Sequence, residues 1–139
     1  MLCILGCSFF TSCSKNNDLI GTKWTITYMD TKYIVEFTSE TDVVSYEADA
    51  NNNYVNYLHE DTYTLSGDRV TFTNNKLFFM DMIGISIVYY YDFLYGDIKG
   101  NTMKLTTKER KLTINWSDEG DPSSMEELGE KEFTLMKVQ

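Results

Sequence analysis

Leu19-Ile20-Gly21-Thr22-Lys23-Trp24-Thr25-Ile26-Thr27-Tyr28 opens an alternation of large and polar residues that continues through this 139-residue chain. Its largest side chains, those of Trp24, Ile26 and Tyr28, alternate with threonines. This period of two residues is typical of a β-strand with one buried face. The segment upstream is short and apolar, and the segments downstream repeat the alternation. The sequence therefore predicts one all-β domain behind a leader.

The downstream segments are short alternating runs separated by turn signals. Asn, Asp and Gly recur roughly every 8–12 residues, and neither a βαβ unit nor an internal repeat is present. This spacing predicts an antiparallel up-and-down β-barrel of about eight to ten strands. Strands are predicted at residues 32–38, 43–48, 54–65, 69–73, 85–93, 102–107, 111–116 and 132–138.

Two local patterns add detail to this prediction. The charged triplet Lys108-Glu109-Arg110 predicts a turn that joins residues 102–107 and 111–116 as a hairpin. Residues 122–129 contain a Ser-x-x-Glu capping box followed by a glycine, and they predict one short helix before the last strand.

Composition narrows the functions open to the chain. A net charge of −9 repels phosphate backbones, so nucleic acid is excluded as a partner. Residues 99–111 include five basic side chains and one acidic one, whereas residues 118–132 include seven acidic side chains and one basic one. Either neighbouring hairpins carry complementary surface charge, or one of the two segments is a docking patch.

All three cysteines, Cys3, Cys7 and Cys13, precede the domain, which excludes a disulfide framework spread through the fold. Residues 1–11 are mostly apolar, carry no charged side chain, and are too short to span a membrane. They have the length of the apolar core of a signal peptide. The usual basic residues are missing, so either the true start lies upstream or the leader is atypical.

Phe10-Thr11-Ser12-Cys13 resembles the lipid-attachment signal of bacterial lipoproteins, in which small residues precede the lipidated Cys. Ile4-Leu5-Gly6-Cys7 is a second candidate, but the polar run typical of a tether follows Cys13. The resemblance implies a signal peptide over residues 1–12 and a lipidated Cys13 with its tether over residues 13–20. It also implies that the lipid holds the protein at the outer membrane, facing the periplasm or the cell surface.

The domain over residues 21–139 resembles the small lipocalin-like lipoproteins of Gram-negative envelopes. The matching motifs are residues 19–24, 63–68, 98–105 and 133–138. The resemblance implies a lipocalin-like barrel, and an eight-stranded barrel is either filled by side chains or holds one small ligand, here a hydrophobic one. The inward faces of the predicted strands supply the candidate ligand-facing residues, which are Trp24, Tyr28, Tyr33, Phe37, Tyr63, Tyr89, Tyr91 and Trp116.

A different function is a surface module that binds glycan or a partner protein through exposed aromatic rings, with Tyr90 and Tyr95 as the candidate residues. The single histidine, His59, lacks the companions of a zinc site, and residues 118–121 lack the spacing of a calcium loop. Catalytic motifs are missing. We therefore expect a non-enzymatic protein without cofactor or metal, and the oligomeric state stays open.

Overall fold

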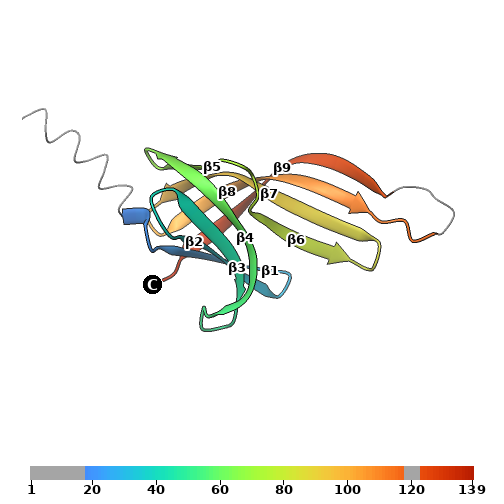
Figure 1. Cartoon of the computed structure of the whole chain (residues 1–139), viewed down its shortest axis with the longest axis horizontal. Helices are drawn as coiled ribbons and strands as arrows, with labels where there is room; N and C mark the ends of the chain where they lie inside the picture. Colours follow the sequence, from blue (N-terminus) through green and yellow to red (C-terminus); the bar gives the residue numbers. More distant parts are fainter. Residues whose placement is uncertain (1–17, 118–122) are drawn as a thin grey trace, which may run out of the picture.

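The computed structural model describes residues 18–117 and 123–139, and the regular structure of these two segments is β-sheet (Figure 1). Residues 18–20 form a helical turn that leads into the first strand. The strands are β1 (Lys23–Tyr28), β2 (Thr31–Phe37), β3 (Asp42–Ala48), β4 (Tyr54–Ser66), β5 (Arg69–Phe72), β6 (Phe78–Ile83), β7 (Ile87–Lys99), β8 (Thr102–Thr113) and β9 (Ser124–Lys137). The prediction of an all-β domain is confirmed.

Eight of these strands close into an antiparallel barrel. β1 to β5 pair in chain order, β5 then pairs with residues 95–97 of β7, and β8 and β9 follow. The ring closes where the start of β1 meets the end of β9, with Trp24 opposite Lys137. β6 is the extra strand, and it pairs with residues 87–92 of β7.

β7, β8 and β9 have 13, 12 and 14 residues, against 6 in β1, so they continue past the barrel. Their far halves and β6 form a sheet that extends away from the barrel (Figure 1). We call it the projecting sheet; it consists of β6, residues 87–92 of β7, 108–113 of β8 and 124–130 of β9. The barrel end beside this sheet is called the mouth, and the end where the chain enters β1 is called the base.

Two register shifts mark where the long strands leave the barrel. In β7 the shift lies between Phe93 and Tyr95, where the neighbouring strand changes from β6 to β5. In the β8–β9 pair it lies at Glu109 and Arg110, beside Gly129, whose φ of 104° favours glycine. Such bulges bend and twist a strand, which lets one strand serve both the barrel and the projecting sheet.

Large apolar side chains fill the barrel. Phe37 packs edge-on against Tyr63 with ring centroids 4.8 Å apart, and Phe79 packs in the same way against Phe93 at 4.8 Å. Contacts this close leave no space between the paired rings for a ligand. The same core includes Leu19, Trp24, Tyr33, Val35, Val43, Val70, Phe72, Leu77, Tyr91, Met103, Leu105 and Leu135.

A buried carboxylate fixes the connection between β5 and β6. Asp61 is 5% exposed and accepts hydrogen bonds from the backbone N–H groups of Thr62 (2.7 Å), Asn74 (3.1 Å) and Lys76 (3.1 Å). The Asn74 side-chain amide donates a further bond of 2.9 Å. Because two of these donors belong to the segment before β6, Asp61 helps to set where β6 begins.

The predicted short helix over residues 122–129 is wrong. Residue 122 lies outside the described segments, and from Ser124 onward the chain forms β9. This part of β9 pairs in register with β8, and Lys108 Nζ lies 2.5 Å from Glu127 Oε1. Strand pairing along the whole segment outweighs the local capping preference, and the glycine accommodates a bulge instead of ending a helix.

The predicted hairpin around residues 108–110 is also wrong, because β8 runs unbroken from Thr102 to Thr113. The charged residues interpreted as a turn signal pair with the neighbouring strands instead. Arg110 binds Asp92 of β7, and Lys108 binds Glu127 of β9. The described parts of the basic and acidic segments, residues 102–111 and 124–132, thus lie on the adjacent strands β8 and β9 and carry complementary charge.

Candidate functional site

The predicted ligand-facing residues lie in three different places. Those near the base are buried in the packed core, those at the mouth form one aromatic layer, and the others belong to the projecting sheet. The three groups are Trp24, Phe37 and Tyr63 near the base; Tyr28, Tyr33 and Tyr91 at the mouth; and Tyr89 and Trp116 on or beside the projecting sheet.

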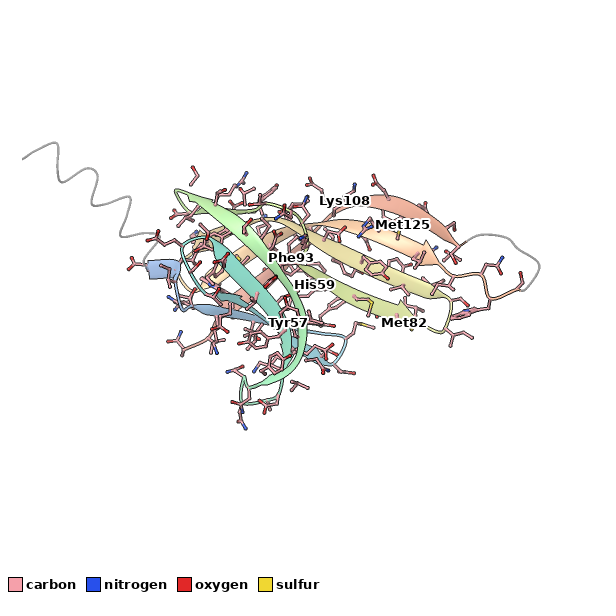
Figure 2. All side chains as sticks on the ribbon, viewed as in Figure 1. Tyr57, His59, Met82, Phe93, Lys108 and Met125 are labelled. Atoms are coloured by element: carbon pink, nitrogen blue, oxygen red, sulfur yellow. The ribbon has the colours of Figure 1, made fainter. Side chains whose placement is uncertain are left out.

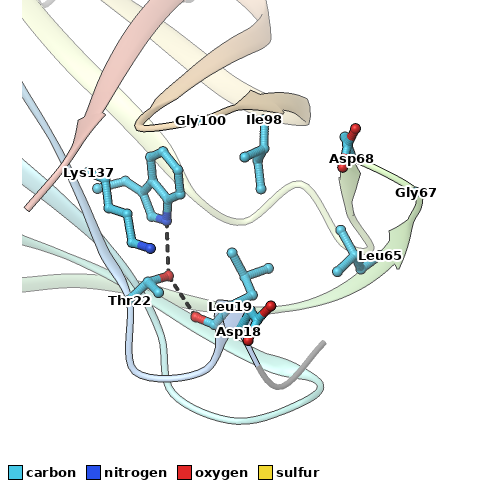
Figure 3. Close-up of a pocket in the computed structure, with 10 residues that line it drawn as sticks. Asp18, Leu19, Thr22, Leu65, Gly67, Asp68, Ile98, Gly100 and Lys137 are labelled. Carbon is cyan, nitrogen blue, oxygen red and sulfur yellow. Dashed lines mark hydrogen bonds between the residues drawn. The ribbon is translucent and has the colours of Figure 1, made fainter. Parts of the chain in front are cut away.

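The base carries a pocket of about 260 Å³ (Figure 3). Trp24 Nε1 donates a 3.0 Å hydrogen bond to Thr22 Oγ1, and that hydroxyl donates a 2.6 Å bond to the Leu19 carbonyl. Leu19 is 5% exposed and is part of the core, so the chain before β1 closes the barrel here. Other residues lining the pocket are Asp18, Leu65, Gly67, Asp68, Ile98, Gly100 and Lys137.

Five aromatic rings form a layer across the mouth. Tyr28 lies edge-on to Tyr91 and Phe133, with ring centroids 5.7 and 5.4 Å apart. Phe79 joins them, 4.9 Å from Tyr33 and 5.5 Å from Phe133. The Tyr28 hydroxyl donates to the Tyr91 hydroxyl at 3.1 Å, so β1 and β7 are joined across the mouth.

Two carboxylates, those of Glu47 and Asp81, act on the Tyr33 hydroxyl. Burial raises the pKa of the Tyr33 hydroxyl above its ordinary value, and the carboxylates of Glu47 and Asp81 raise it further. Glu47 lies opposite Tyr33 in the β2–β3 pairing and therefore shares its inward face. The mouth thus collects carboxylates from β3 and β6.

Tyr91 lies in a similar field. Burial raises the pKa of its hydroxyl first, followed by the hydrogen bond with Tyr28 and by the negative charges of Glu109 and Asp81. The ammonium of Lys131 lies 4.9 Å from the centroid of the Tyr91 ring. At this distance, the positive charge is attracted to the face of the ring.

Tyr89 and Trp116 lie apart from this layer. Tyr89 is partly buried and packs against the core. Trp116 is 66% exposed, and its Nε1 donates to the Ile85 carbonyl at 2.8 Å. It lies outside the barrel because β8 ends at Thr113, beyond the mouth. The predicted set therefore does not line a single cavity.

Tyr90, one of the two predicted surface tyrosines, belongs to a charged constellation on the outer face of the projecting sheet. Arg110 Nε and Nη2 donate to the two carboxylate oxygens of Asp92 at 2.6 and 2.8 Å. The same guanidinium lies 5.5 Å from the centroid of the Tyr90 ring. Asp92 is only 9% exposed, so its carboxylate is largely shielded from water, whereas the Arg110 side chain is 32% exposed.

Tyr95 repeats the arrangement farther along β7. Arg69 of β5 donates to Asp97 at 2.7 and 2.9 Å, and its guanidinium lies 4.2 Å from the centroid of the Tyr95 ring. The bulge between Phe93 and Tyr95 shifts the alternation by one residue and keeps both tyrosines on the outer face.

An apolar row crosses the outer face nearer the tip of the projecting sheet. Met82 of β6, Val88 of β7, Leu112 of β8 and Met125 of β9 lie side by side in register. Met82 and Met125 are 55% and 48% exposed, and both lie on the projecting sheet (Figure 2). Met80, on the same face of β6, is 45% exposed. We call Met80, Met82, Leu112 and Met125 the methionine face.

Sequence reasoning did not single out Asp81, Arg69 or Arg110. A signal for the arginines was present, because Tyr-x-Asp occurs twice in β7, at residues 90–92 and 95–97. Asp81 had a weaker signal, since it occupies an inward position of the alternation that also contains Phe79.

Cys13, the predicted lipidation site, lies outside the described segments, as do Cys3, Cys7 and the acidic residues 118–121. Within the described segments, no helix has the length and apolar character needed to cross a membrane. The same segments hold no group of three or more His, Cys, Asp or Glu side chains suited to a metal ion. His59 is half-buried on β4, opposite Ser45 of β3.

No family model, curated protein or solved structure matches the chain.

Proposed function

We propose that this protein is a lipid-anchored component of the bacterial envelope whose lipocalin-like domain binds a partner protein and catalyses no reaction. The methionine face is the observation that carries the proposal, because three of its side chains, those of Met80, Met82 and Met125, are 45–55% exposed on a sheet that extends away from the barrel. The motif Phe10-Thr11-Ser12-Cys13 and the polar tether that follows it support the anchor.

The composition of the outer face favours a protein as the partner. Contiguous exposed apolar groups with a polar rim are typical of protein contact surfaces, and Met, Tyr and Arg are enriched in them. Met82 and Met125 supply the adaptable apolar centre. The Arg110–Asp92 pair and the Lys108–Glu127 pair supply a polar rim on the side nearer the barrel.

Glycan fits this surface less well. Sugars stack on open ring faces, and a guanidinium lies over one face of both Tyr90 and Tyr95. Those guanidiniums are also fixed by two hydrogen bonds each to Asp92 and Asp97, which leaves them fewer donors for sugar hydroxyls. The side chains of the neighbouring apolar row offer a sugar only the weakly accepting sulfurs of methionine.

A photo-crosslinking experiment tests the surface. A benzophenone amino acid is placed at position 82 or, as a control, at position 29, where Met29 is 63% exposed on the β1–β2 turn. Illumination of living Gram-negative cells is expected to give one discrete protein adduct from position 82 and none from position 29. Met125→Lys in the first variant is expected to abolish the adduct. Equal adducts from both positions, or an adduct with a second copy of the chain, would contradict the proposal.

The anchor is tested by metabolic labelling with an alkyne-bearing palmitate. The full chain and its Cys7→Ala variant are expected to incorporate label, whereas Cys13→Ala is expected to remain unlabelled and to retain its leader. If Cys7→Ala lost the label and Cys13→Ala kept it, the lipid attachment site would be Cys7 and not Cys13. Unlabelled full chain would exclude a lipid anchor.

A small hydrophobic ligand is the second candidate function, and the base pocket is the observation that favours it. Its apolar walls are formed by Leu19, Trp24, Leu65 and Ile98. Native mass spectrometry of the purified full chain is expected to show a co-purifying lipophile that is lost in Leu65→Trp, which fills the pocket. If the spectra showed only the protein without a bound lipophile, and fatty-acid probes did not bind, the hypothesis of a small hydrophobic ligand would be contradicted.

A further inference from the structure

The outer face of β1 to β4 carries a groove of about 370 Å³. Its lining residues come from all four strands and from the loop between β3 and β4. It shares none of them with the base pocket or with the methionine face. We call it the hairpin groove, because the β3–β4 hairpin forms one of its sides.

The hairpin covers part of the outer face of the barrel. Ile34 and Tyr46 lie opposite each other on this face, outside the barrel core, yet they are only 0% and 5% exposed. Two register shifts in the β3–β4 pair bend the hairpin, and β4 curves along its length (Figure 1). Lys23 of β1 and Asn52 of the hairpin loop line the same groove, so the loop lies over the outer face of the sheet.

Two tyrosine rings give the groove an open aromatic wall. Tyr54 and Tyr57 are 60% and 51% exposed. The Tyr54 ring lies 5.6 Å from the ring of Tyr46, whose hydroxyl donates to Glu36 at 2.9 Å. Among the described residues no cation lies over the Tyr54 or Tyr57 ring, in contrast to the outer tyrosines of β7. Their faces are therefore available to stack against the C–H groups of a sugar ring.

The loop that closes the groove is fixed by its own hydrogen bonds. Asp49 accepts from the backbone N–H groups of Asn51 and Asn53 at 2.8 and 2.9 Å, and from the Asn53 side-chain amide at 3.1 Å. The Asn52 N–H donates to the Asp49 carbonyl at 3.1 Å. A loop held in this way loses little conformational freedom when a ligand binds beside it.

The polar atoms that the groove offers are mainly acceptors. The Asn53 side-chain N–H is engaged by Asp49, which leaves its amide oxygen for a ligand. Asn52 Oδ1 has no hydrogen-bond partner among the described residues, so turning it toward a ligand breaks no hydrogen bond. Glu36 makes its hydrogen bond and its ion pair through Oε2, which leaves Oε1. A ligand rich in hydroxyl groups supplies donors to such a set, whereas a peptide backbone carries about as many acceptors as donors.

A second hollow of about 440 Å³ continues the groove along β3 and β4, because Val44 lines both. Its polar lining includes the carboxylates of Asp42 and Glu60, the hydroxyl of Thr62 and the ammonium of Lys76. The carboxylates in the two hollows disfavour an acidic ligand. A chain of sugars can occupy both hollows, whereas a single sugar occupies only one.

We propose that the hairpin groove binds a neutral oligosaccharide. One sugar ring stacks on the wall formed by Tyr54 and Tyr57, and its hydroxyls donate to Asn52, Asn53 and Glu36. The chain continues past Val44 into the second hollow. This site lies on the barrel wall, so it is independent of a partner protein bound at the methionine face of the projecting sheet.

A glycan array probed with the fluorescently labelled full chain tests the proposal. It carries neutral oligosaccharides of glucose, galactose, mannose, xylose and N-acetylglucosamine beside sulfated and uronic-acid glycans. At least one neutral oligosaccharide is expected to bind, and calorimetry is expected to show at least about tenfold weaker binding of its monosaccharide. An array without a neutral binder, or with acidic binders only, would overturn the proposal. A displayed peptide that binds in place of any glycan, and whose binding requires Tyr57, would assign the groove to a protein partner instead.

Variants locate the site by calorimetry with the oligosaccharide that the array identifies. Tyr54→Ala combined with Tyr57→Ala is expected to weaken binding about tenfold or more, whereas the corresponding Phe double variant keeps the rings and is expected to stay within about threefold. Trp116→Ala, which removes a ring that is 66% exposed at the projecting sheet, is expected to leave the affinity within about twofold. Equal effects of the Tyr→Ala pair and Trp116→Ala, or unchanged affinity in the Tyr→Ala pair, would contradict the assignment.

Asn52→Gly tests the loop. Asn52 has a φ of 65°, which glycine adopts without strain, so the substitution removes the side chain and preserves the backbone. It is expected to weaken binding at least about threefold. The midpoint of urea unfolding is expected to stay near that of the unmodified chain. Full affinity in Asn52→Gly would contradict the role of the loop amide.

Discussion

Tyr28 and Tyr91 lie 63 positions apart in the sequence, yet their hydroxyls meet at 3.1 Å across the mouth of the barrel. This contact joins the first strand to the strand shared by the barrel and the projecting sheet. Both rings also pack edge-on against Phe133 of β9. Three strands are thereby held together at the point where the ring of strands gives way to an open sheet.

The raised pKa of Tyr91 makes stability sensitive to alkaline pH. Because burial and nearby carboxylates raise the pKa of the folded-state phenol, its contribution to stability is fully present below the ordinary tyrosine pKa of about 10. That contribution is lost as pH rises from about 10 toward the folded-state pKa. Tyr91→Phe is expected to flatten this alkaline loss in urea unfolding measured at several pH values. Tyr54→Phe, on a ring that is 60% exposed, is the control; an equal effect in both variants would contradict this prediction.

The two Arg–Asp pairs on β7 are expected to differ in their contribution to stability. Asp92 and Arg110 have side chains 13% and 32% exposed, whereas those of Asp97 and Arg69 are 45% and 52% exposed. We expect Asp92→Asn to lower the free energy of unfolding by about 2 kcal/mol, and Asp97→Asn to lower it by less. Urea denaturation measures both. A larger loss of stability in Asp97→Asn than in Asp92→Asn would show that burial does not determine how much these ion pairs contribute to stability.

Gly96 is required by the packing of Met103. A Cβ at this position would lie 2.7 Å from Met103 Sδ, and Met103 is completely buried. We expect Gly96→Ala to cost about 1–3 kcal/mol in urea denaturation. In the double variant with Met103→Ala, the added methyl group occupies vacated space. The double variant is therefore expected to lose less stability than the sum of the losses in the two single variants. Strict additivity would count against this contact.

Asp61→Asn is expected to destabilise the segment before β6. The amide presents a donor where the carboxylate accepts hydrogen bonds from Asn74 and Lys76. A loss of about 2–4 kcal/mol is expected, because backbone donors become buried without acceptors. Hydrogen exchange is expected to show faster exchange in residues 74–83 than elsewhere. Uniform acceleration across the barrel would indicate a global effect instead.

The alternation of large and polar residues was sufficient to predict most strands. It placed Trp24, Phe37 and Tyr63 inside the barrel, and all three are buried there. It also brought Tyr28 and Tyr91 to the inward face, where they meet. Strand alternation depends only on local sequence, so a single chain displays it directly.

The errors arose where long-range pairing overrode local signals. The triplet at residues 108–110 resembles a turn when considered alone, but its partners Asp92 and Glu127 lie 18 and 19 positions away. The capping box at residues 124–127 likewise yielded to pairing with β8. Trp116 has the alternation of an inward residue but follows a strand that has already passed the mouth.

The candidate site was only partly accessible to sequence reasoning. The ring cluster followed from alternation, whereas the place of Asp81 beside Tyr89 depends on how β6 pairs with β7. The same holds for Arg69 and Arg110, which reach β7 from different neighbouring strands. Contacts between strands that are distant in the sequence are not encoded in any short motif.

Both ends of the described chain lie at the base. Asp18 and Lys137 line the same pocket there, and the C-terminus is opposite the projecting sheet (Figure 1). A sensor chip, affinity bead or fluorescent fusion coupled at either terminus would therefore leave the projecting sheet, at the opposite end of the molecule, unobstructed in solution.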